Sequence, residues 1–258
     1  MRREKSNYMI QSVSHALDVI EQFGADQEEL GVTELSKRLK LHKNNVFRLL
    51  ATLESRGYIE QNKSTENYRL GLRCLQLGQR YVRQIGLLEQ ARPVMQEMVK
   101  SCRETALLAV YRNAGMVPVE AVETHQPVRL VPTIGDLLPL HCTAVGKAHL
   151  AFAAAEERDA ALPRTLQRFT DKTITEKQSL LRHLQEVAQN GFATDVGEYV
   201  ADVCSVAVPI RDYTRSVVAC LAVQGPAYRL TAEHTAAGIV PAVVDAGRQI
   251  STRLGFNG

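Results

Sequence analysis

Five polar side chains gather on one side of a short segment in the first third of the chain, and their types are those that contact nucleic acid. They are Lys43, Asn44, Asn45, Arg48 and Thr52, with no acidic side chain among them. Amides and guanidinium groups can pair with base edges, and cations can pair with phosphates. The alternative is an amphipathic surface helix whose polar face is only solvated.

The opposite side of the same segment is apolar at helical spacing. Val46, Leu49, Leu50 and Leu53 fall at positions i, i+3, i+4 and i+7, which predicts a helix that buries one stripe. Gly57 is expected to stop this helix, because glycine is favoured just beyond a helix C-terminus.

An earlier helix is expected over residues 12–23. Ser12 is a candidate N-cap, and Val13, Leu17 and Ile20 with Phe23 supply an inward-facing stripe. This helix would give the polar segment an apolar surface to pack on.

A second short helix is expected over residues 34–39, with Thr33 as its cap. Only residues 40–42 separate it from the polar segment. Two short helices joined by a turn of three or four residues form a helix-turn-helix.

Two short strands, residues 58–60 and 68–70, surround a polar tip after Gly57. They predict a wing on which Lys63 and Arg69 could touch the DNA backbone. Three helices and this hairpin make a winged helix-turn-helix of about 60 residues, near the lower size at which a domain folds alone.

Composition and charge describe an ordinary globular protein. The chain has 258 residues, 45% hydrophobic and 23% charged, enough for one large or two ordinary domains. The net charge is only +3, yet residues 37–48 hold five lysines and arginines and no acid. Such a local concentration of charge can steer phosphate even when the whole domain is near neutral.

The sequence also carries signals about location. It has no apolar run of about 18 residues and no apolar leader near its start, so neither a membrane span nor a secretory signal is expected. Its five cysteines are odd in number and include no Cys-x-x-Cys pair, which favours reduced thiols and a cytoplasmic location.

The second half of the sequence reads as a mixture of helices and strands. Strands are expected at residues 105–112, 116–123, 203–210 and 216–224, with 128–132 as a possible further strand. Helices are expected at residues 143–154, from a capping box at Thr175-x-x-Gln178 to Gly191, and at 231–254, where Pro241 should kink the helix or shift its start.

Catalytic motifs do not emerge from this half. Phosphate-loop and Gly-x-Ser-x-Gly patterns are absent. His141, Cys142, Asp195 and Cys204 could in principle form a metal site, but adjacent residues rarely ligate one ion well. We therefore expect a binding module, with no catalytic residue, metal or cofactor.

One segment of the second half could bind an anion. Thr143-Ala-Val-Gly at a helix start offers backbone N–H groups and the positive end of a helix dipole, which suit a carboxylate. The alternative is that these small residues only permit close packing of helix on sheet.

Several motifs in one order resemble the isocitrate-lyase-regulator (IclR) family of bacterial transcription factors. In the first half they include Val46-Phe-Arg-Leu-Leu-Ala-Thr-Leu-Glu and Tyr68-Arg-Leu-Gly-Leu, and in the second Pro139-Leu-His-Cys-Thr-Ala-Val-Gly-Lys-Ala and Gly191-Phe-Ala-Thr-Asp. The resemblance covers roughly residues 10–254.

The resemblance implies an α+β architecture in three parts. A winged helix-turn-helix at residues 8–72 would be followed by a linker and dimerisation helix at 73–88. A GAF/profilin-like α/β effector-binding domain with an antiparallel sheet would occupy residues 89–258. It also implies a homodimer, and a dimer of dimers is usual in such proteins.

Site residues follow from the polar segment and from the resemblance together. Contacts with double-stranded operator DNA are expected from Thr33, Ser36, His42, Lys43, Asn44, Asn45, Arg48, Lys63 and Arg69. By resemblance, the effector pocket would involve Leu130, Ile134, Thr143, Ala144, Val145, Gly146, Asp195, Cys204, Ser205, Ala222 and Gln224.

Four of the pocket positions depart from the pattern of the family. Ser205 stands where cysteine is usual, with Cys204 one residue away, and Ala222 and Gln224 stand where some members have serines. These departures predict an effector that differs from those known for the family, and we expect a small organic acid such as an aromatic or sugar-derived catabolite.

The expected function is sequence-specific transcriptional regulation, more often repression than activation in this family. The alternatives are a transcriptional activator of a catabolic operon, a small-molecule-binding enzyme with an appended winged helix, and a DNA-binding protein without an effector.

Overall fold

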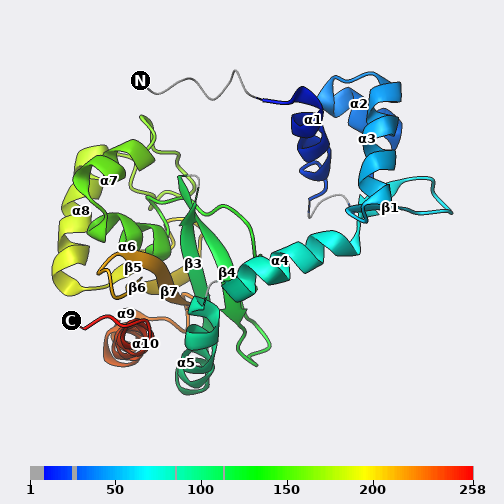
Figure 1. Ribbon diagram of the computed structural model, residues 1–258. Coiled ribbons are helices and arrows are strands. Elements are labelled where there is room, and N and C mark those ends of the chain that lie inside the picture. Colours follow the sequence, from blue (N-terminus) through cyan, green and yellow to red (C-terminus); the bar gives the residue numbers. More distant parts are fainter. Residues whose placement is uncertain (1–8, 25–27, 85, 113, 258) are drawn as a thin grey trace. The chain divides into compact units, whose positions relative to one another are not determined.

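The computed structural model describes residues 9–24, 28–84, 86–112 and 114–257 of the chain (Figure 1). The chain divides into two compact units, Met1–Gln84 and Ile85–Gly258. Residues 8, 85 and 258, which belong to the domains expected from the sequence, lie outside the described residues. The domain limits 8–72, 73–88 and 89–258 therefore stay a prediction.

The first unit is a helix-turn-helix with a two-stranded wing, as the sequence predicts. Its elements are α1 (Gln11–Ile20), α2 (Val32–Leu39), α3 (Lys43–Ser55), β1 (Ile59–Gln61), β2 (Tyr68–Leu70) and α4 (Leu72–Gln84). The strands β1 and β2 pair antiparallel, with Ile59 opposite Leu70.

The core of this unit is built around α3. Val46 and Leu50 are fully buried and Leu53 nearly so, whereas Leu49 is half-buried at the edge of the stripe. They pack with Leu35 of α2 and other apolar residues of the unit. The polar side of α3 is thereby turned to solvent.

The stripe predicted for the first helix is confirmed in part, because Ile20 and Phe23 are partly buried against the core of the unit. Val13 and Leu17 are 54% and 53% exposed, whereas Val19 is fully buried. The core of the unit packs on Val19 and Ile20 near the end of this short helix and leaves Val13 and Leu17 outside it.

The predicted helix caps of this unit are wrong. Ser12 lies inside α1, whose N-cap is Ile10, and Thr33 lies in the first turn of α2, whose N-cap is Gly31. Neither N-cap residue accepts a hydrogen bond through its side chain.

The second unit is an antiparallel sheet between two layers of helices. Its elements are α5 (Leu87–Cys102), β3 (Thr105–Arg112), β4 (Gly115–Val122), α6 (Ala144–Phe152), α7 (Ala155–Ala161), α8 (Lys177–Asn190), β5 (Ala193–Val196), β6 (Val203–Arg211), β7 (Val217–Pro226), α9 (Ala232–His234), a π-helical segment (Thr235–Ile239) and α10 (Val240–Arg253). The strand order is β4-β3-β7-β6-β5.

Each face of this sheet has its own apolar core. The helices α5 and α10 cover one face, where Val206 and Ile210 of β6 are buried. The helices α6 and α8 cover the other face, where Ala207 of β6 is buried. Because side chains alternate along a strand, odd and even positions of β6 belong to different layers.

Several details of the second unit differ from the sequence prediction. Residues 128–132 form no strand and belong to a loop, while β5 and α7 were not expected. The capping box is wrong, because α8 begins at Lys177 with Glu176 as its N-cap. The expected disturbance at Pro241 takes the form of the π-helical segment directly before α10.

Among the described residues, none of the helices is both long and apolar enough to cross a membrane.

Candidate nucleic-acid interface and ligand cavity

The polar face of α3 is open to solvent. Lys43, Asn44, Asn45, Arg48 and Thr52 are all exposed, and the Thr52 hydroxyl donates to the carbonyl of Arg48 over 2.8 Å. Neither Lys43 nor Arg48 forms an ion pair within the described part of the chain. This face therefore offers amide groups and uncompensated cations together.

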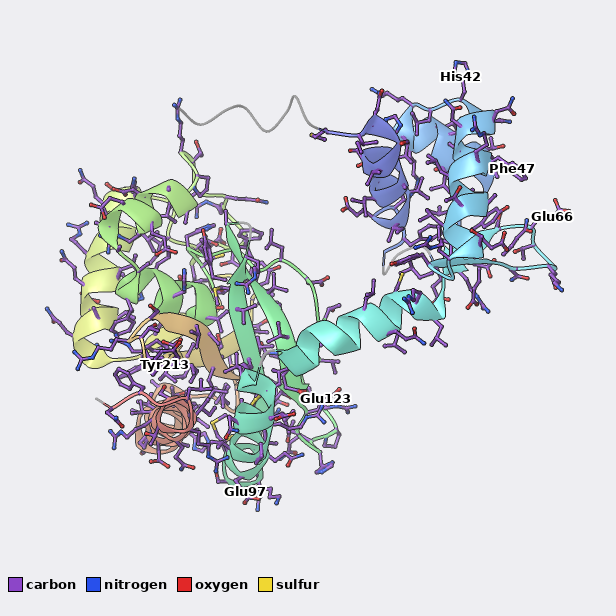
Figure 2. All side chains as sticks on the ribbon, viewed as in Figure 1. His42, Phe47, Glu66, Glu97, Glu123 and Tyr213 are labelled. Carbon is purple, nitrogen blue, oxygen red and sulfur yellow. The ribbon has the colours of Figure 1, made fainter. Side chains whose placement is uncertain are left out.

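The start of α3 adds the positive end of a helix dipole. Its N-cap, His42, is exposed and gives no side-chain cap bond (Figure 2). Thr33 is likewise exposed at the start of α2. The Ser36 hydroxyl donates to the carbonyl of Leu41 over 2.6 Å and closes the turn, and its contact with DNA stays a prediction.

The wing holds its tip by hydrogen bonds to an acid outside it. Asn62 and Thr65 donate to the two carboxylate oxygens of Glu29 at 2.6 and 2.8 Å. These bonds hold the pKa of Glu29 below its ordinary value. Lys63 is exposed at the tip, whereas the Arg69 Nη2 lies 3.5 Å from Glu60.

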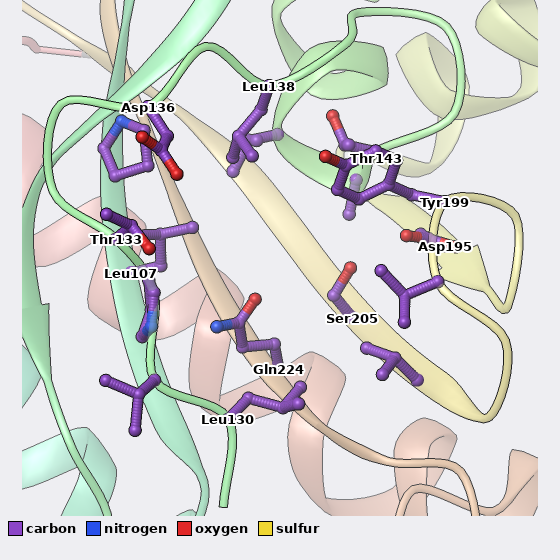
Figure 3. A pocket seen from close by; sticks show the side chains of 17 residues that line it. Leu107, Leu130, Thr133, Asp136, Leu138, Thr143, Asp195, Tyr199, Ser205 and Gln224 are labelled. Carbon is purple, nitrogen blue, oxygen red and sulfur yellow. The ribbon is translucent and has the colours of Figure 1, made fainter. Parts of the chain in front are cut away.

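A cavity of about 260 Å³ lies in the second unit, against the sheet face that carries α6 (Figure 3). Its walls are the N-terminus of α6, the sheet, the loop 130–138 and the loop 199–203. The polar and apolar side chains that line it come from segments far apart in the sequence.

Three polar side chains form a row across neighbouring strands. Asp195 of β5 lies opposite Ser205 of β6, and Ser205 lies opposite Gln224 of β7. All three line the cavity, and Figure 3 shows Asp195 next to Thr143 and Tyr199. Asp195, Ser205 and Gln224 were all predicted for the pocket, but their alignment across three strands follows from the strand register.

Two other named positions do not reach the cavity. Cys204 points to the opposite face of the sheet, because neighbouring side chains of a strand alternate between its faces and Ser205 faces the cavity. Ala222 shares the face of Gln224 but is 2% exposed within the core under α6. The cysteine expected in the pocket therefore has no counterpart there, and a serine takes its place.

The loop that follows β4 forms much of the outer wall. Leu130 lines the cavity as expected, whereas Ile134 is 54% exposed and does not. Thr133, Asp136 and Leu138 also line it and were not predicted. The loop has no periodic pattern, so its sequence gave no signal of which side chains turn inward.

The start of α6 is arranged around a capped helix end. The Thr143 hydroxyl accepts from the Gly146 N–H at 3.1 Å and donates to the Pro139 carbonyl at 2.6 Å. The N–H groups of Ala144 and Val145 have no acceptor within a helix that begins at Ala144. Both residues line the cavity, so these donors are available to a ligand.

Gly146 has a packing role that the sequence left open. A Cβ at this position would lie 2.3 Å from the Leu140 carbonyl oxygen. The glycine therefore allows α6 to approach the preceding segment closely, and it is not among the residues that line the cavity.

The electrostatics of the cavity are dominated by acids. Burial raises the pKa of Asp195 to about 6, although its Oδ1 accepts the Glu198 N–H at 2.7 Å. Asp136 also lines the cavity, and no lysine, arginine or histidine does so among the residues that the structure describes. A ligand must therefore offer hydrogen-bond donors to this end of the cavity.

A buried ion pair lies behind the cavity. Lys147 of α6 is fully buried and pairs with Glu198, whose carbonyl accepts the Thr173 hydroxyl at 2.6 Å. Glu198 precedes Tyr199, which lines the cavity. The pair thus ties the loop that bears Tyr199 to the helix that supplies the backbone donors.

The metal alternative weighed from the sequence finds no support in the geometry. The Nε2 of His141 lies 2.8 Å from the Gln167 carbonyl oxygen, and Cys204 is on the far face of the sheet. Burial raises the pKa of the Cys142 thiol to about 12. No group of three or more potential ligands converges in the described residues.

Two family models match the chain. The IclR helix-turn-helix domain matches residues 12–63, and the bacterial transcriptional regulator IclR C-terminal domain matches residues 79–252. The chain belongs to the IclR family. It is a transcriptional regulator with a DNA-binding helix-turn-helix and a C-terminal domain of this family.

Individual relatives span the chain. The transcriptional regulator KdgR of Escherichia coli K12 is 29% identical over 98% of this chain and 96% of its own length. The transcriptional repressor AllR of the same strain is 29% identical, with 95% and 91% covered. An IclR homologue from Microbacterium hydrocarbonoxydans, solved in complex with 4-hydroxybenzoate, has a TM-score of 0.85 at 26% identity, with 95% and 99% covered.

Proposed function

We propose that this IclR-family regulator is a repressor, and that a small hydroxylated organic acid in the cavity of its second unit releases it from operator DNA. The observation that carries the proposal is the cavity itself. It places the free N–H groups of Ala144 and Val145 near a polar row of Asp195, Ser205 and Gln224.

The N-terminus of α6 suits the carboxylate of such a ligand. Backbone N–H groups and the helix dipole both favour negative charge at this point. The cavity supplies no cation among the described residues, so these groups must provide the attraction.

The polar row suits hydroxyl groups on the same ligand. An ionised Asp195 only accepts hydrogen bonds, while Ser205 and Gln224 can donate or accept. A carboxylate placed beside Asp195 would be repelled, whereas a hydroxyl would donate to it. The volume of about 260 Å³ is below the range of about 300–1,000 Å³ typical of drug-sized ligands, which favours a small metabolite.

The relatives agree with this chemistry without fixing the ligand. The Microbacterium protein was solved with 4-hydroxybenzoate, which carries one carboxylate and one hydroxyl. AllR is named a repressor, and that name supports repression here over activation.

DNA recognition is assigned to the first unit. In this proposal Asn44, Asn45 and Arg48 contact bases in the major groove, while Lys43 and Lys63 contact phosphates. A dimer would bind two half-sites about one helical turn apart or a multiple of it. The ligand shifts the balance between bound and free regulator only by its difference in affinity for the two states.

Calorimetry on the full chain tests the ligand class. Hydroxy acids of increasing size are compared with the same acids lacking the hydroxyl and with their amides, which lack the charge. The proposal expects the hydroxy acid to bind tightest, and a Gln224→Leu variant to lose the preference for the hydroxyl. Absence of binding across the whole panel would contradict the proposal.

A reporter fused to a selected operator tests the direction of control. Repression predicts that deleting the regulator raises expression and that a bound ligand reproduces the deletion. Lower expression on deletion would instead establish activation.

A further inference from the structure

The exposed side of α3 carries one aromatic residue, which the proposed contacts with bases and phosphates do not use. Phe47 is 56% exposed and projects from the helix (Figure 2). Its neighbours on the same side are Asn44, one turn earlier, and Arg48, and the exposed Ala51 follows one turn later.

The ring of Phe47 is not packed in the core of the first unit. The buried residues of α3 are Val46, Leu50 and Leu53, and Phe47 is not among the residues packed on them. A single exposed apolar side chain is common on protein surfaces. Phe47 differs because it lies within the polar, cationic stretch 43–48 that has no acid of its own.

Position along the helix also matters. Recognition helices of this motif contact base edges mainly with their N-terminal residues. Phe47 is the fifth residue of α3, which begins at Lys43. If α3 reads DNA as proposed, a ring at this position would face the same groove as the amides and the guanidinium group beside it.

The major groove offers one apolar group to such a ring. Thymine presents a C5-methyl group there, while cytosine presents an unsubstituted edge and an amino donor. Phenylalanine is among the residues that contact this methyl group. Contact removes both apolar surfaces from water, which is favourable.

We propose that Phe47 is a specificity-determining residue that packs on the C5-methyl group of one thymine in each half-site of the operator. The proposal rests on the proposed reading of DNA by α3. It goes further by assigning T·A over C·G at one position to a named apolar contact.

The experiment removes the methyl group alone. Duplexes that bind the full chain are first selected from a randomised pool, and each thymine of the preferred site is then replaced by deoxyuridine. We expect one thymine in each half-site at which the replacement weakens binding about three- to tenfold, the scale of one buried methyl group.

Variants of the protein assign that effect to the ring. Phe47→Ala should bind thymine and deoxyuridine duplexes equally at that position, and Phe47→Leu should keep part of the preference. Leu70→Ala, at an exposed leucine of the wing, is the matched control and should keep it fully. Because Phe47 and Leu70 are both exposed, we expect all three variants to fold, which thermal unfolding checks.

The outcomes separate the inference from the proposed function. Selection of no preferred duplex would overturn the proposed function and the inference with it. A preferred site that is indifferent to every deoxyuridine would overturn the inference alone. A thymine preference that survives in Phe47→Ala would also overturn the inference alone. A Phe47→Ala variant that loses self-association but keeps the thymine preference would do the same.

Discussion

At the scale of single residues, Asp195 links the cavity to pH. Burial raises its pKa from 3.8 to about 6, so the folded chain holds this proton more tightly than the unfolded chain does. The free energy of unfolding contributed by this group therefore falls as the pH rises from about 4 to about 6, and is constant above.

An Asp195→Asn variant should remove this dependence, since an amide oxygen can still accept the Glu198 N–H. As the pH rises from 4 to 7, the free energy of unfolding of the variant minus that of the native chain should increase by on the order of 2 kcal/mol. Urea titrations at stepped pH measure it. Asp171→Asn, at an exposed position, is the control. If the difference in unfolding free energy between the variant and the native chain does not change with pH, Asp195 is not a buried acid with a raised pKa.

Arg48 is the residue of α3 whose loss should weaken operator binding. Arg48→Ala should weaken binding to the selected operator by about 1–3 kcal/mol, because one base contact is lost. Arg56→Ala, exposed at the end of α3, should have a smaller effect. Gel-shift titrations at one fixed salt concentration compare the two, and unchanged affinity for Arg48→Ala would remove this residue from the recognition surface.

Between helix and loop, Lys147 and Glu198 form a pair whose loss should be asymmetric. Lys147→Met leaves the buried Glu198 carboxylate without its cation and should cost about 3–5 kcal/mol of unfolding free energy. The double variant Lys147→Met/Glu198→Leu should recover most of that loss, because no charge stays buried. Equal losses in the single and double variants would show that packing, and not charge, is responsible.

At the scale of elements, Arg229 fixes the loop that walls the cavity. Its Nη2 donates to the Glu104 carboxylate at 2.9 Å and to the Val128 carbonyl at 2.8 Å. Glu104 is only 3% exposed, and a Cβ on Gly225 would lie 2.6 Å from its carboxylate oxygen. The start of the loop is therefore joined by one guanidinium group to the residue that directly precedes the inner strand β3.

Arg229→Ala should lower the unfolding free energy by about 3 kcal/mol, because a buried carboxylate loses its partner. It should also weaken ligand binding in the cavity. Arg129→Ala breaks the more exposed pair with Glu123 in the same region and should cost less than about 1 kcal/mol. Denaturant unfolding and calorimetry on both variants test this, and similar losses in the two would contradict it.

At the scale of the whole molecule, the helix α4 exposes three leucines, two of them on one side. Leu72 and Leu75, three residues apart, are 60% and 57% exposed on that side, whereas Leu77, 42% exposed, lies on another side of the helix. Exposed leucines at this spacing favour burial against another copy of the chain, in line with the linker and dimerisation helix expected from the sequence.

Replacing Leu72 and Leu75 by glutamate should dissociate the expected dimer and weaken operator binding, because two half-sites would no longer be held together. Sedimentation velocity measures the first effect and gel shifts the second. Leu17→Glu, at a leucine of α1 that is similarly exposed, is the control. A native chain that sediments as a monomer would contradict the assignment.

The sequence by itself determined the parts that rest on local patterns. The stripe Val46, Leu50 and Leu53 follows from helical spacing, because every neighbour that decides it is close along the chain, and the strands β3 and β6 follow from runs of strand-forming residues. The family motifs added the order of the domains.

Only the tertiary structure decided which of two possible faces was covered. Val13 and Leu17 read as core and are exposed, because the core of the unit packs on Val19 and Ile20 near the end of the helix instead. Ser205 faces the cavity and Cys204 the opposite layer, because the register of β6 with its neighbours fixes which face each side chain takes. The cavity wall at Thr133 and Asp136 lies in a loop without a period, so only contacts between distant segments could place it.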